Sequence, residues 1–161
     1  MLHSVAPPGY HVLAVRVRYA ETDAMGVAHH ASYVPWLESG RVEWLRQQGI
    51  AYAELERQGL HLPVVELRIR YLRPAHFDDL LHVHTALAEL TRARVCFIYT
   101  LLRPGEGAPL AAAETRHCYL DESGRPLRLP VTSPHWQRFA GLPVAGAAEP
   151  QQAPPAPGRG R

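Results

Sequence analysis

The sequence lacks lysine and has little cysteine. All 17 basic residues are arginines, and 15 acidic residues balance them to a formal net charge of +2 over 161 residues. So small an excess argues against a protein that binds nucleic acid through bulk charge, and leaves only a local arginine patch to consider. Cys96 and Cys118 are too few for a disulfide framework and lack the spacing of a metal site. Both lie in apolar, strand-like stretches, which predicts buried thiols.

Long apolar runs and targeting signals are also missing. No stretch approaches the roughly 18 apolar residues that cross a membrane. The first ten residues have no basic start, and Pro7-Pro8 interrupts them, so we predict an N-terminal extension over 1–10 rather than a secretory signal. The sequence contains no G-x-S-x-G elbow, phosphate-binding glycine loop, dinucleotide fingerprint or C-x-x-C pair. We expect a cytoplasmic protein.

The length suits one domain. Residues 143–161 are mostly Pro, Ala and Gly, and such a segment buries too little apolar surface to offset the entropy of ordering it. We therefore predict a domain over 11–142 followed by a disordered tail.

The first half of this domain predicts one strand and one long helix. Residues 11–20 alternate between apolar and polar side chains, as in a half-buried strand, and 21–32 form a loop rich in small and polar residues. Ser32 can cap a helix over 33–48 that ends near Gly49. Apolar residues spread around most of this helix, which predicts that it is buried.

The second half predicts mainly strands. We expect a short helix over 51–58, strands over 65–71, 81–90, 94–103 and 110–120, and a short C-terminal helix over 132–139. Short loops between the strands favour antiparallel pairing. The sequence therefore predicts an α+β domain in which an antiparallel sheet curls around one long helix.

Chemistry-bearing side chains gather in the loop before the long helix. Tyr19, Asp23, His29 and His30 lie there, and the helix start adds backbone N–H groups without partners. Such an N–H can polarise a carbonyl oxygen, which is worth roughly 3 to 4 kcal/mol, while Asp23 acts as base or nucleophile. The adjacent histidines have no third ligand at metal-binding spacing, so we expect neither a metal nor a cofactor.

These residues fall into a longer pattern, Y-x-x-T-D-x-x-G-h-h-x-H-x-x-Y-h-x-h-h-E-x-x-R, where h is apolar. It is formed by Tyr19, Thr22, Asp23, Gly26, His30, Tyr33, Glu38 and Arg41. The likeness continues through 70–75, 78–81 and 125–130. In this pattern the chain resembles the hotdog-fold acyl-CoA thioesterases of the 4-hydroxybenzoyl-CoA thioesterase type, including the branch associated with the Tol–Pal system.

The resemblance implies a sheet wrapped around one helix, and a homodimer or homotetramer with active sites at the dimer interface. It implies that Asp23 is the catalytic carboxylate, assisted by Tyr19 and His30, and that the His30 N–H holds the thioester oxygen. The residues expected to contact substrate are Gly26, Val27, His29 and Tyr33. Because CoA carries phosphates, Arg92 and Arg94 are the first candidates for its binding. The second candidates are Arg70, Arg73 and Arg128.

Several alternatives remain open at this stage. Asp23 could activate water or attack the carbonyl itself, and the acyl donor could be CoA or acyl carrier protein. Another hotdog branch uses a helical glutamate for catalysis, but we interpret Glu38 as structural, with Arg41 close enough to pair with it. The competing functions are a hotdog hydratase or dehydratase, a non-catalytic module that binds acyl-CoA or scaffolds a partner, and, disfavoured by the charge balance, a nucleic-acid binder.

Overall fold

The computed structural model describes residues 9–145, so most of the predicted extension and tail lie outside the described residues. The elements are β1 (Tyr10–Arg16), α1 (Tyr33–Gln47), α2 (Tyr52–Arg57), β2 (Val64–Tyr71), β3 (Leu80–Leu90), β4 (Arg94–Leu102), β5 (Ala111–Leu120), β6 (Pro126–Leu127) and α3 (Pro134–Phe139). Short 3-10 turns at Tyr19–Glu21 and His30–Ser32 precede α1. The predicted order of one strand, one long helix and four further strands is confirmed, and the two-residue strand β6 is an addition that was not predicted.

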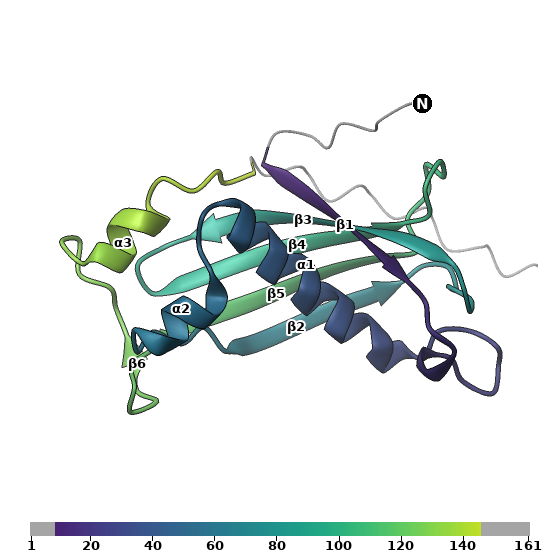
Figure 1. The fold of residues 1–161 in the computed structure, drawn as a ribbon, viewed down its shortest axis with the longest axis horizontal. Coiled ribbons are helices and arrows are strands. Elements are labelled where there is room, and N and C mark those ends of the chain that lie inside the picture. The colour runs from purple at the N-terminus through teal and green to yellow at the C-terminus, as the bar shows by residue number, and fades with distance from the viewer. Residues whose placement is uncertain (1–8, 146–161) are drawn as a thin grey trace, which may run out of the picture.

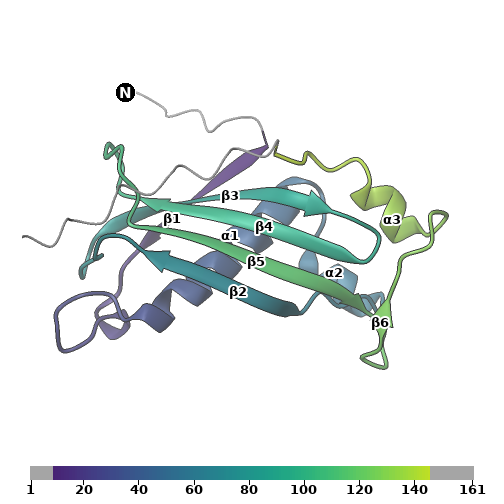
Figure 2. The ribbon, with the colours of Figure 1, turned by 180° about the vertical axis from the view of Figure 1, so that it is seen from behind.

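The strands form one antiparallel sheet in the order β1-β3-β4-β5-β2, with β6 paired to β5. The helix α1 lies across one face of this sheet, and the view from behind shows the strands in front of it (Figures 1 and 2). Two strands, β1 and β2, are the edges of the sheet. The predicted α+β class is confirmed.

The core lies between α1 and the sheet. Trp44 is fully buried, packs edge-on against Phe97 with 5.4 Å between ring centroids, and donates from Nε1 to the Gly9 carbonyl at 2.9 Å. We predicted that α1 is buried on most sides, but only the face toward the sheet is buried, because a single chain covers the helix with a sheet on one side only. Pro35 and Ser39, on the other side of α1, are exposed.

Two boundaries differ from the sequence prediction. The first strand ends at Arg16 rather than near residue 20, since Tyr19–Glu21 turns into a 3-10 helix. The predicted tail begins too early, because Val144 pairs with Leu87 and the Ala145 N–H donates to the Leu87 carbonyl at 2.8 Å. Both cysteines are free thiols, but only Cys96 is buried; Cys118 is half-buried.

Gly40 allows α1 to pack closely against β3, because it has no side chain. A Cβ at Gly40 would lie 2.5 Å from Thr85 Oγ1 and 3.1 Å from Val83 Cγ1. Alanine would improve the helix propensity by about 1 kcal/mol, but overpacking a well-filled core costs typically 1 to 3 kcal/mol. Since 2.5 Å is too short for a real contact, the cost should fall in the upper part of this range, about 2 to 3 kcal/mol. We therefore expect Gly40→Ala to lower the free energy of unfolding by about 1 to 2 kcal/mol in a urea titration.

The control for this prediction removes the obstructing atom. Thr85 Oγ1 is buried and has no hydrogen-bond partner within the described residues, so Thr85→Ala breaks no hydrogen bond there. In that background the cost of Gly40→Ala should shrink markedly. Equal stability of Gly40→Ala and the parent would contradict the predicted clash.

Candidate active site

The loop that carries Asp23 is a small hairpin. Thr22 pairs with Ala28 in an antiparallel bridge, the Asp23 N–H donates to the Val27 carbonyl at 2.9 Å, and the Gly26 N–H donates to the Asp23 carbonyl at 2.9 Å. Gly26 has a φ of +75°, a conformation that favours glycine. The turn therefore fixes the backbone of Asp23 even though the loop lies at the surface.

Only one oxygen of the Asp23 carboxylate is hydrogen-bonded within the described residues. Its Oδ1 accepts a hydrogen bond from the Met25 N–H at 2.8 Å, and no bond to Oδ2 is formed within residues 9–145. The side chain is half-buried. One oxygen is thus held by the turn while the other is available to a water molecule or a carbonyl carbon.

The 3-10 turn before α1, with His29 as its N-cap and His30 as its first residue, carries the two histidines. Their exposed rings lie 4.1 Å apart, and His29 Nδ1 accepts from the Ala31 N–H at 3.2 Å. The His30 carbonyl accepts from the Tyr71 hydroxyl at 2.9 Å, whereas its N–H finds no backbone acceptor in the described part of the chain. This N–H is the one the resemblance implied as the oxyanion donor, and it is available for that role.

Glu21 holds this loop in place, a role that was not predicted from the sequence. Its carboxylate, 8% exposed at the residue level, accepts from the Arg18 N–H at 2.8 Å, from Arg18 Nη2 at 2.8 Å and from Trp36 Nε1 at 3.1 Å. Burial acts to raise the pKa of Glu21, but these hydrogen bonds outweigh burial and hold the pKa below its ordinary value. The spacing of three residues between Arg18 and Glu21, which allows an ion pair, was the available signal.

The backbone of Glu21 ties the loop to the helix. Its carbonyl accepts from the His29 N–H at 2.7 Å and from the Ser32 hydroxyl at 2.9 Å. Ser32 does occupy the N-cap position of α1, but its hydroxyl makes this bond instead of capping the helix. The hairpin with Asp23 and the turn with His30 are therefore held to each other.

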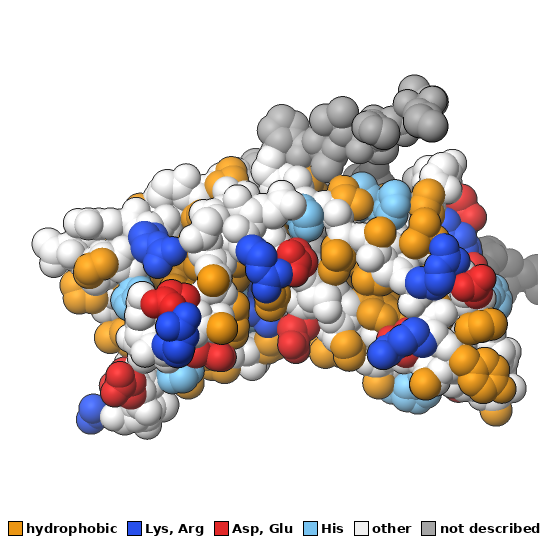
Figure 3. Space-filling view, viewed as in Figure 1, with side chains coloured by type: hydrophobic (Ala, Val, Ile, Leu, Met, Phe, Trp, Pro, Cys, Tyr) orange, Lys and Arg blue, Asp and Glu red, His pale blue; other side chains and the backbone are white. Residues whose placement is uncertain are grey.

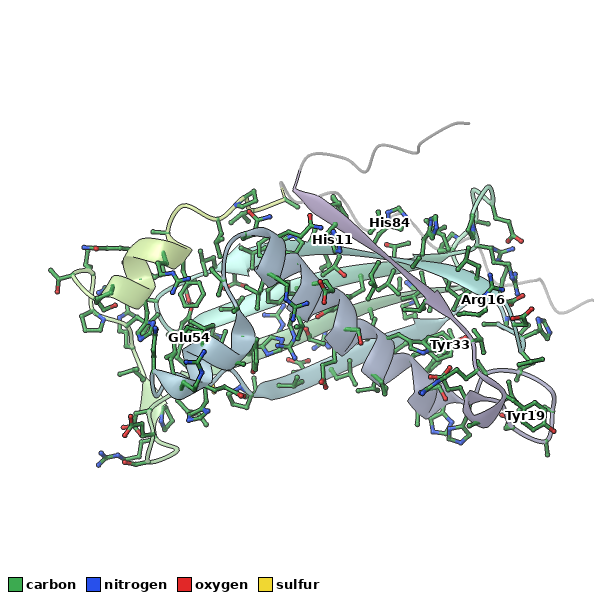
Figure 4. All side chains as sticks on the ribbon, viewed as in Figure 1. His11, Arg16, Tyr19, Tyr33, Glu54 and His84 are labelled. Carbon is green, nitrogen blue, oxygen red and sulfur yellow. The ribbon has the colours of Figure 1, made fainter. Side chains whose placement is uncertain are left out.

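The two tyrosines of the motif have different environments. Tyr19 is 78% exposed, lies on the outer part of the loop (Figure 4) and packs edge-to-face on Phe77 at 5.7 Å. Its hydroxyl makes no hydrogen bond to Asp23 in the described structure, so the predicted contact is not formed here. Tyr33 is buried at the start of α1 against Trp36 and Tyr71, and burial raises its pKa.

Arg92 and Arg94, the first candidates for phosphate binding, lie far from Asp23 within one chain. The loop that carries Asp23 meets the sheet where Val27 pairs with His76, four residues before the first residue of β3. Arg92 and Arg94 follow the last residue of β3, so 11 strand residues, or roughly 35 Å, separate the two places. Nearer the loop, Arg103 is already bound to the Asp79 carboxylate at 2.8 Å.

A cavity of about 100 Å³ opens between α1 and the sheet. Its walls combine apolar and polar side chains from α1, β2, β4 and β5: Val34, Leu37, Glu38, Arg41, Val64, Leu67, Tyr99 and Thr115. Val34 is one helical turn beyond His30, so the cavity begins close to the predicted oxyanion donor. On this face of the molecule, apolar side chains lie exposed between charged ones (Figure 3).

Two features are absent from residues 9–145. Residues 9–145 contain no group of three or more histidine, cysteine, aspartate or glutamate side chains placed to hold a metal ion. Among the helices of this region, none has the length and hydrophobicity needed to cross a membrane.

Comparison with known proteins identifies the class. Residues 17–157 match the family model of the Thioesterase-like superfamily. The chain is 32% identical over 122 residues to a putative acyl-CoA thioesterase, YneP, of Bacillus subtilis, covering 76% of this chain and 88% of the relative. The chain therefore belongs to the Thioesterase-like superfamily.

Solved structures agree with this placement. A hypothetical protein of Thermus thermophilus, TT1821, superposes with a TM-score of 0.74 at 39% identity over 81% of this chain and 98% of that one. A DHNA-CoA thioesterase of Staphylococcus aureus gives 0.75 at 28% identity over 81% and 89%. The chain has the hotdog fold and is a thioester hydrolase.

Proposed function

We propose that this protein hydrolyses an acyl-CoA thioester to a carboxylic acid and free CoA. One observation carries the proposal: the Asp23 carboxylate, with one oxygen still without a hydrogen bond, lies in a loop that the Glu21 carbonyl ties to His29 and Ser32, on either side of the His30 N–H. A base or nucleophile and an oxyanion donor on one braced segment are the two groups that thioester hydrolysis requires. The named activities of the relatives support the same class of substrate.

In the proposed reaction the His30 N–H donates to the thioester carbonyl oxygen as negative charge develops on it. Asp23 takes a proton from water while the water oxygen bonds to the carbonyl carbon; the C–S bond then breaks, and the protonated Asp23 returns that proton to the CoA thiolate, which regenerates the carboxylate. In the alternative route Asp23 Oδ2 bonds to the carbon, releases the thiolate and forms a mixed anhydride that water cleaves. His30 and Tyr19 would order the water or the carboxylate in either route.

The acyl group would lie along α1 in the cavity that begins at Val34, beyond Gly26, Val27, His29 and Tyr33. Since Arg92 and Arg94 lie at the other end of the same chain, their contact with CoA requires a second copy. The proposal therefore includes the homodimer or homotetramer with shared sites. A cytoplasmic location and membership of the Tol–Pal-associated branch remain predictions.

The test is free-thiol release from a panel of short, medium, long and aryl acyl-CoAs. We expect turnover of at least one class, with a kcat/KM that rises as the acyl group fits the cavity. Absence of turnover across the panel, by folded protein that still binds CoA, would contradict the proposal. It would then favour an acyl carrier protein donor, which the same panel on carrier protein tests, or a non-catalytic module.

A further inference from the structure

The last residue of β2 is tied to the turn that precedes α1. The Tyr71 hydroxyl donates to the His30 carbonyl at 2.9 Å, although 41 positions separate the two residues in sequence. The end of β2 lies beside the start of α1 in both ribbon views (Figures 1 and 2). This hydrogen bond therefore joins the sheet to the residue whose N–H is the proposed oxyanion donor.

The ring of Tyr71 is held in place as well as its hydroxyl. It packs edge-to-face on Tyr33 with 5.0 Å between centroids, and the Tyr33 ring lies 4.9 Å from that of Trp36. Trp36 in turn donates from Nε1 to the Glu21 carboxylate at 3.1 Å. Partial burial raises the pKa of Tyr71, so the phenol stays protonated and remains a donor at neutral pH.

The backbone of His30 is fixed on both sides. The peptide plane that contains its N–H also contains the His29 carbonyl, which accepts from the Ser32 N–H at 2.9 Å within the turn. The next plane contains the His30 carbonyl, which accepts from Tyr71 on the sheet. Because a peptide group is rigid and planar, a bond on each of these carbonyls restricts the direction in which the His30 N–H points.

The segment after β2 holds the other part of the candidate site, the hairpin of Asp23. The Ala28 N–H of this hairpin donates to the Ala75 carbonyl at 2.7 Å, four residues after Tyr71. The strand β2 and its continuation thus contact both the hairpin and the turn that contains His30. The Tyr71 bond is part of one frame that sets the position of the oxyanion donor relative to the carboxylate.

We propose that Tyr71 is a positioning residue for the reaction: its hydroxyl orients the turn so that the His30 N–H meets the negative charge that develops on the thioester oxygen. This inference rests on the proposed thioester hydrolysis and adds a residue to it. A donor that is already aimed at the developing charge needs no reorganisation during the reaction, and this is the source of its effect on the rate. Tyr71 acts through His30 and contacts no reacting atom.

Tyr71→Phe tests this role, because it removes the hydroxyl and keeps the ring that packs on Tyr33. Complete loss of an oxyanion donor costs about 10²- to 10³-fold in kcat, whereas this variant keeps the donor and loosens its aim. We therefore expect kcat toward the best acyl-CoA substrate to fall by about 10- to 10²-fold. KM should stay within about twofold of the parent value, since the interaction strengthens only in the transition state.

The matched control is Tyr119→Phe. The Tyr119 hydroxyl also donates to a backbone carbonyl, that of Thr91 at 3.1 Å, but beyond the far end of β3. Each variant loses one hydrogen bond of the same kind, so urea titrations should show a small loss of stability in both. Only Tyr71→Phe should lower kcat, and a general loss of stability would then not explain the effect.

A second readout follows the turn without any substrate. Amide hydrogen exchange at the Ser32 N–H, which bonds within the turn, should become about tenfold faster in Tyr71→Phe and stay unchanged in Tyr119→Phe. Unchanged exchange, a kcat within about twofold of the parent, or a rise in KM alone would overturn the positioning role and leave thioester hydrolysis intact. Absence of turnover by the parent would instead overturn the proposed function, and this role with it.

Discussion

Asp23→Asn should lower kcat toward the best acyl-CoA substrate by about 10²- to 10⁴-fold, the range for loss of a general base. Asparagine keeps an Oδ1 that accepts from the Met25 N–H, so the turn should persist and the free energy of unfolding should change little. The amide has no basic oxygen to take a proton from water. Stopped-assay kinetics and a urea titration of the same preparation measure the two quantities together.

Asp121→Asn is the matched control. Asp121 Oδ1 accepts from the Ser123 N–H at 2.8 Å, the same i to i+2 bond that Asp23 makes to Met25, but in the turn between β5 and β6. It should therefore leave kcat unchanged. Equal activity of Asp23→Asn and Asp121→Asn would remove Asp23 from the reaction, and a loss well beyond 10⁴-fold would favour covalent attack over base catalysis.

The second large effect is a loss of stability in mild acid. Burial lowers the pKa of His117 to about 4 in the folded protein, with the positive charge of Arg41 acting in the same direction. In the unfolded chain its ordinary pKa is about 6.5. Because the folded pKa is the lower one, the unfolded state binds more protons between these values, and the free energy of unfolding should fall by about 3 kcal/mol as the pH drops from 6.5 to 4.

The hydrogen-bond network explains why His117 stays neutral. The Leu62 carbonyl can only accept, so His117 Nδ1, 3.1 Å away, carries the proton and Nε2 accepts from the Thr115 hydroxyl at 2.9 Å. The Tyr99 hydroxyl, 2.8 Å from Thr115 Oγ1, then donates to it. A proton on Nε2 would oppose the Thr115 donor and place a second positive charge near Arg41.

Urea titrations at several pH values test this prediction against His117→Gln, which retains a donor and an acceptor but does not titrate. The variant should show a shallower decline in stability below pH 6.5 than the parent. His11→Gln, on the edge strand β1, is the control and should decline as the parent does. Identical pH profiles for His117→Gln and the parent would contradict the assignment.

Sequence motifs located the site loop but not its internal contacts. Asp23, His30 and the start of α1 were all predicted, because a turn, a helix start and a motif are local features. The bracing role of Glu21 was not predicted, since its bond to Trp36 joins residues 15 positions apart and depends on how α1 packs. Tyr19 was expected beside Asp23, but the chain leaves β1 earlier than the alternation suggested and turns the phenol outward.

The sequence by itself determined the order of elements, the antiparallel α+β class and the segment that we propose carries the chemistry. These follow from apolar periodicity, turn residues and short connections, all of which act over a few neighbouring residues. Only the tertiary structure decided that Glu38 and Arg41 do not pair, although their spacing permits it, while Glu43 and Arg46 do. The packing of α1 against strands distant in sequence decides which charges are buried and which remain without a partner. Local sequence patterns do not predict that packing.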